Sequence, residues 1–140
     1  MKAGSTWRPL CALASAALLA ACSGGSSDHA TPDDATLHQD IASGRAGAEV
    51  TFDGTLKADP EQVGTHEHLT VATPTGDVLE VDHNTKLAPW VPGHAGDRVI
   101  VHGELYIDPG PRPGVHCTHA HTSSGCPQPG WIELGGNYYE

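Results

Sequence analysis

The chain has 140 residues, of which 17 are acidic and 7 basic, so its formal net charge at pH 7 is −10. A surface of this sign repels phosphate backbones, and the composition therefore argues against nucleic acid as a partner. Aromatic residues make up only 5% of the chain. This predicts a modest core, of the size that one small domain contains.

The first 21 residues have the pattern of a bacterial secretion signal. Lys2 and Arg8 precede an apolar run, residues 11–20, which is too short to span a bilayer. The run ends in Leu-Ala-Ala-Cys, the pattern of a lipoprotein cleavage site at which Cys22 becomes the lipidated first residue. Residue 23 is serine rather than the aspartate that would favour retention in the inner membrane. We therefore expect a cell-envelope lipoprotein, anchored in the membrane through Cys22 on the periplasmic face of the outer membrane; ordinary secretion is the alternative.

Residues 22–35 are rich in Gly, Ser and Asp, and this composition predicts a flexible tether. His29 within it, and His38 shortly after it, are expected to face solvent. Residues 36–140 then form a single domain. After cleavage, five basic residues face seventeen acidic ones, a net charge of −12.

The domain is predicted to begin with a short helix over residues 36–45, capped by Thr36, with Leu37 and Ile41 on one face and Gly44 as its end. Beyond it, apolar residues recur at every second position, which predicts strands at 49–59, 66–73, 78–83, 98–108, 115–120 and 130–139. Residues 60–64 read as a turn. Residues 84–97 read as a crossing broken by Pro and Gly, with Leu87, Trp90 and Val91 as apolar plugs.

Five or six short strands, an early hairpin and a crossing before the fourth strand predict a mainly β fold. The pattern favours a small antiparallel OB-like barrel with a short N-terminal helix. A β-sandwich is the alternative.

Five segments, HEHLTV, VDHNTKLAP, GDRVIVHGEL, VHCTH and PGWIELGGNYY, follow one another between residues 50 and 139. In this order they resemble a family of small bacterial envelope proteins catalogued as domain of unknown function 3465. The resemblance implies a compact OB-like β-domain and brings no established activity. The family pattern corresponds here to His66, His83, Asn84, His116, Thr118, His119, Gly130 and Trp131.

Cys117 and Cys126 form the one cysteine pair expected in the mature domain. In an oxidising envelope they predict a disulfide, which closes a short loop and contributes about 2.5–3 kcal/mol on the chain-entropy model. Metal binding through Cys117, His119, His121 and Cys126 is the alternative. It is disfavoured because the spacing is not the usual C-x-x-C and because oxidation removes both thiolates.

Four histidines form a candidate metal site. His66 begins one strand and His83 ends the next, so hairpin pairing places these strand ends close together. The last part of the chain can bring His116 or His119 alongside, giving a cluster that zinc, copper or nickel would accept. In the alternative interpretation, each histidine hydrogen-bonds a neighbouring group at a strand end.

Two further features are candidates. His68, Glu80, Asp82 and Asp53 are expected to share the solvent face of the first three strands, either as a polar groove or weak cation site or as an ordinary charged face. Trp131 can stack on a sugar or peptide ring, or it can belong to the core.

No motif of a known enzyme class stands out: the sequence lacks G-x-S-x-G, H-E-x-x-H, a phosphate loop and C-x-x-C. The leading hypothesis is an envelope lipoprotein whose OB-like domain binds a small ligand, a glycan or an envelope protein without catalysis. The alternative is a histidine-ligated zinc or copper protein, which either handles the metal or uses it for hydrolysis.

Overall fold

The computed structural model describes residues 28–110 and 112–140, so the predicted signal segment and Cys22 lie outside the described residues. Within these ranges no helix is long and apolar enough to cross a membrane. The elements in chain order are α1 (Asp34–Ser43), β1 (Glu49–Leu56), β2 (Glu61–Val63), β3 (His66–Ala72), β4 (Val78–Asn84), β5 (Arg98–Asp108), β6 (Arg112–His116), β7 (Trp131–Leu134) and β8 (Asn137–Tyr139).

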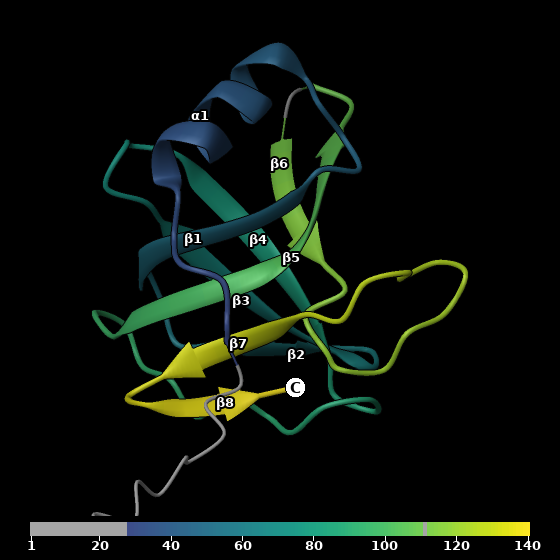
Figure 1. Ribbon diagram of the computed structural model, residues 1–140. Helices are drawn as coiled ribbons and strands as arrows, with labels where there is room; N and C mark the ends of the chain where they lie inside the picture. Colours follow the sequence, from purple (N-terminus) through teal and green to yellow (C-terminus); the bar gives the residue numbers. More distant parts are fainter. Residues whose placement is uncertain (1–27, 111) are drawn as a thin grey trace, which may run out of the picture.

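The expected OB-like barrel is confirmed. Its strands follow the order β1-β3-β4-β6-β5, and β5 pairs back with β1 to close the sheet. The β4–β6 pairing is parallel and the others are antiparallel. Figure 1 shows α1 at one end of the barrel and the loop between β6 and β7 projecting from its side. Because the sheet closes on itself, the β-sandwich alternative is wrong.

The barrel is filled by the apolar residues that the two-residue period assigned to one face. Along β1, β3, β4 and β5, buried and less buried residues alternate as expected. The side chains at the centre are fully buried and include Phe52, Leu69, Val71, Leu79, Val81, Val101, Leu105 and Ile132. β7 extends the sheet beside β5, β8 beside β7, and β2 beside β3.

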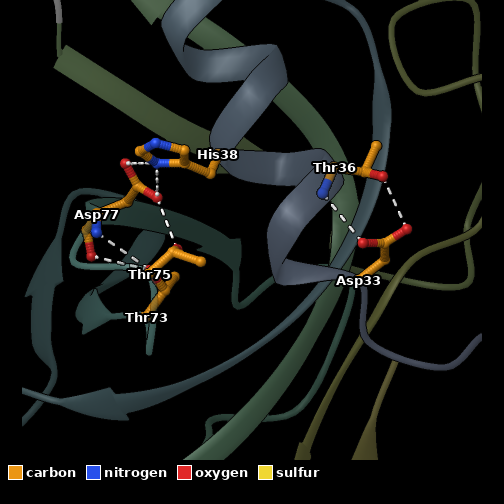
Figure 2. Close-up of polar contacts among 6 residues, drawn as sticks. All are labelled: Asp33, Thr36, His38, Thr73, Thr75 and Asp77. Atoms are coloured by element: carbon orange, nitrogen blue, oxygen red, sulfur yellow. Dashed lines mark hydrogen bonds and ion pairs between the residues drawn. The ribbon is translucent and has the colours of Figure 1, made fainter.

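The helix begins two residues earlier than predicted, and its cap is Asp33 rather than Thr36. The carboxylate of Asp33 accepts hydrogen bonds from the backbone N–H of Thr36 at 3.0 Å and from its hydroxyl at 2.7 Å (Figure 2). An acceptor side chain three residues before the donor N–H is the usual N-cap arrangement, which places Thr36 inside the first turn. The end of the helix at Gly44, with φ of 68°, was predicted correctly.

The turn between β3 and β4 is built by its own side chains and is linked to the helix. The Asp77 N–H donates to the Thr73 hydroxyl at 3.1 Å, and the Thr75 hydroxyl donates to the Asp77 carboxylate at 2.8 Å. Figure 2 shows His38 of α1 reaching the same carboxylate, with Nδ1 3.0 Å from Oδ2. His38 stays exposed, as expected, while it links α1 to this hairpin.

Two loop assignments were wrong. Residues 61–63, which were expected to turn, pair with β3 as the short strand β2. In the crossing between β4 and β5, Val91 plugs the barrel as predicted, but Leu87 and Trp90 are 41% and 40% exposed. The crossing is held by its backbone, since the Val91 N–H and the Pro89 carbonyl both bond to buried side chains. This anchoring turns Val91 inward and leaves its apolar neighbours outside.

Contacts with the barrel begin at His29, before the boundary at residue 36 that composition indicated. The His29 ring stacks on Tyr138 with centroids 3.7 Å apart, and the Asp33 N–H donates to the Thr51 carbonyl at 2.8 Å. The expectation that His29 faces solvent was therefore wrong. The reason is that the β7–β8 hairpin offers exposed aromatic surface on which an imidazole can pack.

Candidate metal centre on the outer face of the barrel

The candidate centre lies on the outer face of the β3–β4 hairpin. His68 of β3 and Asp82 of β4 are directly opposed, and Thr70 is opposed to Glu80 in the next pair of the same face. All four side chains point away from the core because they alternate with the buried apolar residues. The register therefore brings one imidazole and two carboxylates together, as their shared face predicted. Asp53 of the same predicted set instead forms an ion pair with Arg98.

His68, Glu80 and Asp82 converge closely enough to hold one ion. Each offers a ligand atom, and these atoms all lie within 4.8 Å of one another. His68 Nε2 is 3.1 Å from Asp82 Oδ1, close to the spacing of about 3.3 Å between two ligands of a tetrahedral ion with bonds near 2.0 Å. Among the described residues, no other three side chains of His, Cys, Asp or Glu bring their ligand atoms this close together.

One oxygen of Asp82 is poised toward this space. Asp82 Oδ1 is buried and has no hydrogen-bond partner within the described part of the chain, because His68, although 3.1 Å away, lies outside hydrogen-bonding geometry. A buried carboxylate oxygen without a donor is costly. A cation between Oδ1 and the imidazole would satisfy it.

The other oxygen of Asp82 is held by Tyr106 of β5. The Tyr106 hydroxyl donates to Asp82 Oδ2 at 2.8 Å, across the intervening strand β6. Burial, followed by the hydrogen bond to Asp82, raises the pKa of Tyr106 above its usual value, so the phenol keeps the proton that it donates. A hydrogen bond of this kind fixes the orientation of a carboxylate that coordinates a metal.

Gly114 is the residue that lets Tyr106 cross β6. It is paired with Tyr106 in the register, and a Cβ at this position would collide with the tyrosine ring and hydroxyl. The missing side chain thus forms the groove in which the ring lies. Tyr106, Gly114 and Asp82 form a supporting arrangement for the centre.

Two depressions flank the centre. One, of about 260 Å³, is lined by Glu80, Tyr106 and Arg112 among others, and Arg112 Nη2 lies 3.6 Å from Glu80 Oε2. The other, of about 240 Å³, is lined on one side by Asp82. The first depression lies toward the start of β4 and the second toward its end, so solvent reaches the surroundings of the centre from both directions along the strand.

Three of the four histidines predicted as ligands line this second depression. His66, His116 and His119 all border it, together with Asp82 and Asn84. Of these, His116 is also paired with Glu104, with 3.2 Å between Nε2 and Oε1. The strand ends thus meet as expected, although these imidazoles do not belong to the convergent group.

His83, the fourth, is fully buried and does not border the depression. Its Nε2–H donates to the Pro89 carbonyl at 2.9 Å, and Nδ1 accepts from the Thr118 hydroxyl at 2.8 Å. Burial lowers the pKa of His83, which keeps the ring neutral. With both nitrogens occupied by protein groups, His83 has no lone pair to offer a metal, and its role is to hold the crossing.

Glu67, next to His83 in the register, is the second buried group that holds the crossing. Its side chain is fully buried, and Oε2 accepts from the Val91 N–H at 2.9 Å. Burial raises the pKa of Glu67 from 4.5 to about 7. Sequence analysis missed this residue, although its position two before Leu69 was a signal that it faces the core.

The cysteines form the expected disulfide, Cys117–Cys126. β6 ends at His116, and Cys117 has a φ of 58°, in the left-handed region that residues other than glycine rarely adopt. This conformation breaks the alternation of faces, so that Cys117, Thr118 and His119 are all buried in succession. The strand expected at residues 115–120 therefore begins earlier, at Arg112, and ends at His116.

Trp131 is the buried member of a cluster of aromatic rings that also contains His29, His102 and Tyr138. It is 6% exposed and is flanked by His102, whose ring stacks on it with centroids 5.6 Å apart, and by His29 at 4.9 Å. Its burial and these neighbours favour the interpretation that Trp131 belongs to the core over a role in stacking on a sugar or peptide ring. Tyr138 of the same cluster remains 43% exposed.

No protein-family model and no curated protein matches the chain. The resemblance to domain of unknown function 3465 therefore remains a prediction that rests on the five sequence segments.

Proposed function

We propose that the protein is an OB-like binding module of the cell envelope whose ligand is a divalent transition-metal ion, zinc or copper. His68, Glu80 and Asp82 would supply the protein ligands. The observation that carries the proposal is the position of Asp82, with one oxygen bonded to Tyr106 and the other buried, without a donor, beside an imidazole nitrogen.

The ligand set favours zinc or copper over calcium or magnesium. Calcium takes six to eight oxygen ligands, and magnesium prefers an octahedral shell of oxygens, whereas an imidazole with two carboxylates suits zinc and copper. Three protein ligands leave a position for water or for a small ligand. The two depressions beside β4 give access to that position.

The charge of the protein supports a cationic ligand. Seventeen acidic residues against seven basic ones create a negative potential, which concentrates cations at the surface. The same potential disfavours nucleic acid, the ligand of many OB folds.

Location in the envelope is the second part of the proposal. It is supported by the apolar segment ending at Cys22, by the Gly/Ser-rich residues that follow and by the disulfide, which persists in oxidising compartments. The metal centre would then lie near the membrane in which a lipid on Cys22 anchors the protein.

Zinc titration of the oxidised full chain, read with a competing chromophoric chelator, tests the metal ligands. Cys11→Ser and Cys22→Ser are introduced so that no free thiol contributes. We expect one bound equivalent, which His68→Ala abolishes. His94→Ala is the matched control, since His94 forms an exposed pair with Asp59 outside the convergent group and should leave binding unchanged. Equal binding by wild type and His68→Ala would contradict the proposal.

Tyr106→Phe tests the support of Asp82. The variant keeps the ring over Gly114 and removes only the hydroxyl that bonds Asp82 Oδ2. We expect zinc affinity to fall by about 10–100-fold, the range for lost partners of metal-binding groups. Tyr138→Phe, which changes an exposed tyrosine on β8, is the control. An unchanged dissociation constant in Tyr106→Phe would contradict the support of Asp82 by Tyr106.

A further inference from the structure

The disulfide lies at the wall of the depression that three histidines line. Cys117, Cys126, His66, His116 and His119 all border this space of about 240 Å³. Thiolates and imidazoles are the ligands that zinc takes in its structural sites. In the oxidised protein the two sulfurs are bonded to each other, so the depression then contains imidazoles without thiolates.

His119, which borders the depression, has a ring nitrogen without a hydrogen-bond partner. The residue is only 4% exposed, and its Nδ1 is buried with no hydrogen-bond partner in the part of the chain that the structure describes. Burial also lowers the pKa of His119, which keeps the imidazole neutral. When the ring proton is on Nε2, Nδ1 offers a lone pair that a metal can take.

We propose that the reduced form of the protein has a second metal site, in which Cys117, Cys126 and His119 bind a zinc ion. His66 and His116, which line the same space, are placed to supply the fourth ligand. The site is independent of His68 and is absent once the disulfide closes.

The geometry of the cysteines suits a shared ion. Their Cα atoms are 5.4 Å apart, and zinc–sulfur bonds of about 2.3 Å allow two thiolates at this separation to meet at one ion after side-chain rotation. In this step each thiol releases its proton to solvent and each sulfur donates a lone pair to zinc. No electrons are transferred, because every chain carries free thiols before the disulfide forms.

In the proposed envelope location, zinc binding and disulfide formation would use the same two cysteines. Zinc-bound thiolates must be released before the disulfide can form, so the metal and the oxidant compete for Cys117 and Cys126. The site would couple the metal supply of the compartment to the closure of the loop between β6 and β7.

Zinc titration of the reduced full chain tests the site. The protein carries Cys11→Ser and Cys22→Ser, is kept reduced with a phosphine under nitrogen, and is compared with the same protein after oxidation. We expect two equivalents in the reduced form and one in the oxidised form. His119→Gln should remove only the additional equivalent, and His121→Gln, an exposed neighbour outside the depression, should keep it.

Cobalt substitution identifies the ligands directly. We expect thiolate-to-cobalt charge-transfer bands in the reduced form, and their loss in the double variant Cys117→Ser, Cys126→Ser. In the His68→Ala background the additional equivalent should remain, so failure of the first site does not imitate failure of the second. The proposal is overturned if reduction adds no equivalent, if His119→Gln retains it, or if the reduced chain is unfolded and zinc does not refold it.

Discussion

Glu67→Gln is expected to stabilise the protein at about pH 8, by on the order of 3 kcal/mol, and to leave its stability unchanged near pH 4.5. Glu67 is fully buried, and its pKa in the folded protein rises from 4.5 to about 7. Between these values the folded protein holds a proton that the unfolded chain has lost. The contribution of Glu67 to the free energy of unfolding is therefore fully present below about pH 4.5 and is lost as the pH rises to about 7. The loss is about 1.4 kcal/mol for each unit of pKa shift.

Glutamine reproduces the protonated form of Glu67. Its amide carbonyl can accept from the Val91 N–H, as Oε2 does at 2.9 Å, and the side chain has no proton to lose. The stability of the variant should still depend on pH, but only through a loss of stability as the pH falls. Burial lowers the pKa of His83, so this histidine withdraws stability as the pH falls below about 6.5.

Urea unfolding of the oxidised protein at the two pH values measures the effect. Glu61→Gln is the matched control, because Glu61 is an exposed glutamate on β2. We expect the control to follow the wild type at both pH values. Glu67→Gln variants that were no more stable than wild type at about pH 8 would show that the buried carboxyl is not protonated in the neutral range.

Gly130→Ala is expected to destabilise the protein by about 3 kcal/mol, the upper part of the range for overpacking, because the added Cβ would meet rigid backbone atoms. A Cβ at Gly130 would lie 2.6 Å from the carbonyl oxygen of His102 and closer still to that of Cys117. Both are backbone atoms, one in β5 and one at the turn after β6. The Gly130 N–H also donates to the His119 carbonyl at 2.9 Å, so an outward shift of the chain would break this hydrogen bond.

The matched control for Gly130→Ala lies in the same loop. At Gly125 the nearest atom to an added Cβ is the Ser123 hydroxyl oxygen at 3.9 Å, so Gly125→Ala should change stability by less than about 0.5 kcal/mol. Thermal unfolding under oxidising conditions separates the two, with a melting temperature lower by roughly 10 °C or more for Gly130→Ala. Equal melting temperatures for the two variants would contradict the packing described at the start of β7.

The two-residue period of the sequence was sufficient to predict which apolar residues of β1, β3, β4 and β5 point into the barrel. It placed Phe52, Leu69 and Val101 inward, and His68 beside Asp82 on the outer face, because the side-chain period of a strand is fixed by its backbone. The turn at residues 73–77 then set the register of the hairpin. For these reasons the convergent group could be predicted as a shared face.

The support of the centre could not be predicted, since it depends on pairing between distant strands. Tyr106 reaches Asp82 only because β6 lies between β5 and β4 and has Gly114 at the crossing point. No local pattern specifies that a strand inserts there in parallel with β4. Local sequence also did not indicate the left-handed conformation of Cys117, which buries His119. Side-chain periodicity describes neighbours along a strand, whereas these contacts arise from closure of the barrel.

Anomalous diffraction at the zinc edge, from crystals of the oxidised protein grown with zinc, tests the central claim most directly. The account predicts a peak within bonding distance, about 2.0–2.2 Å, of His68 Nε2 and of carboxylate oxygens of Asp82 and Glu80. It also predicts that the Tyr106 hydroxyl keeps its hydrogen bond to Asp82 Oδ2. A map with no peak between β3 and β4, or with zinc bound only elsewhere, would contradict it.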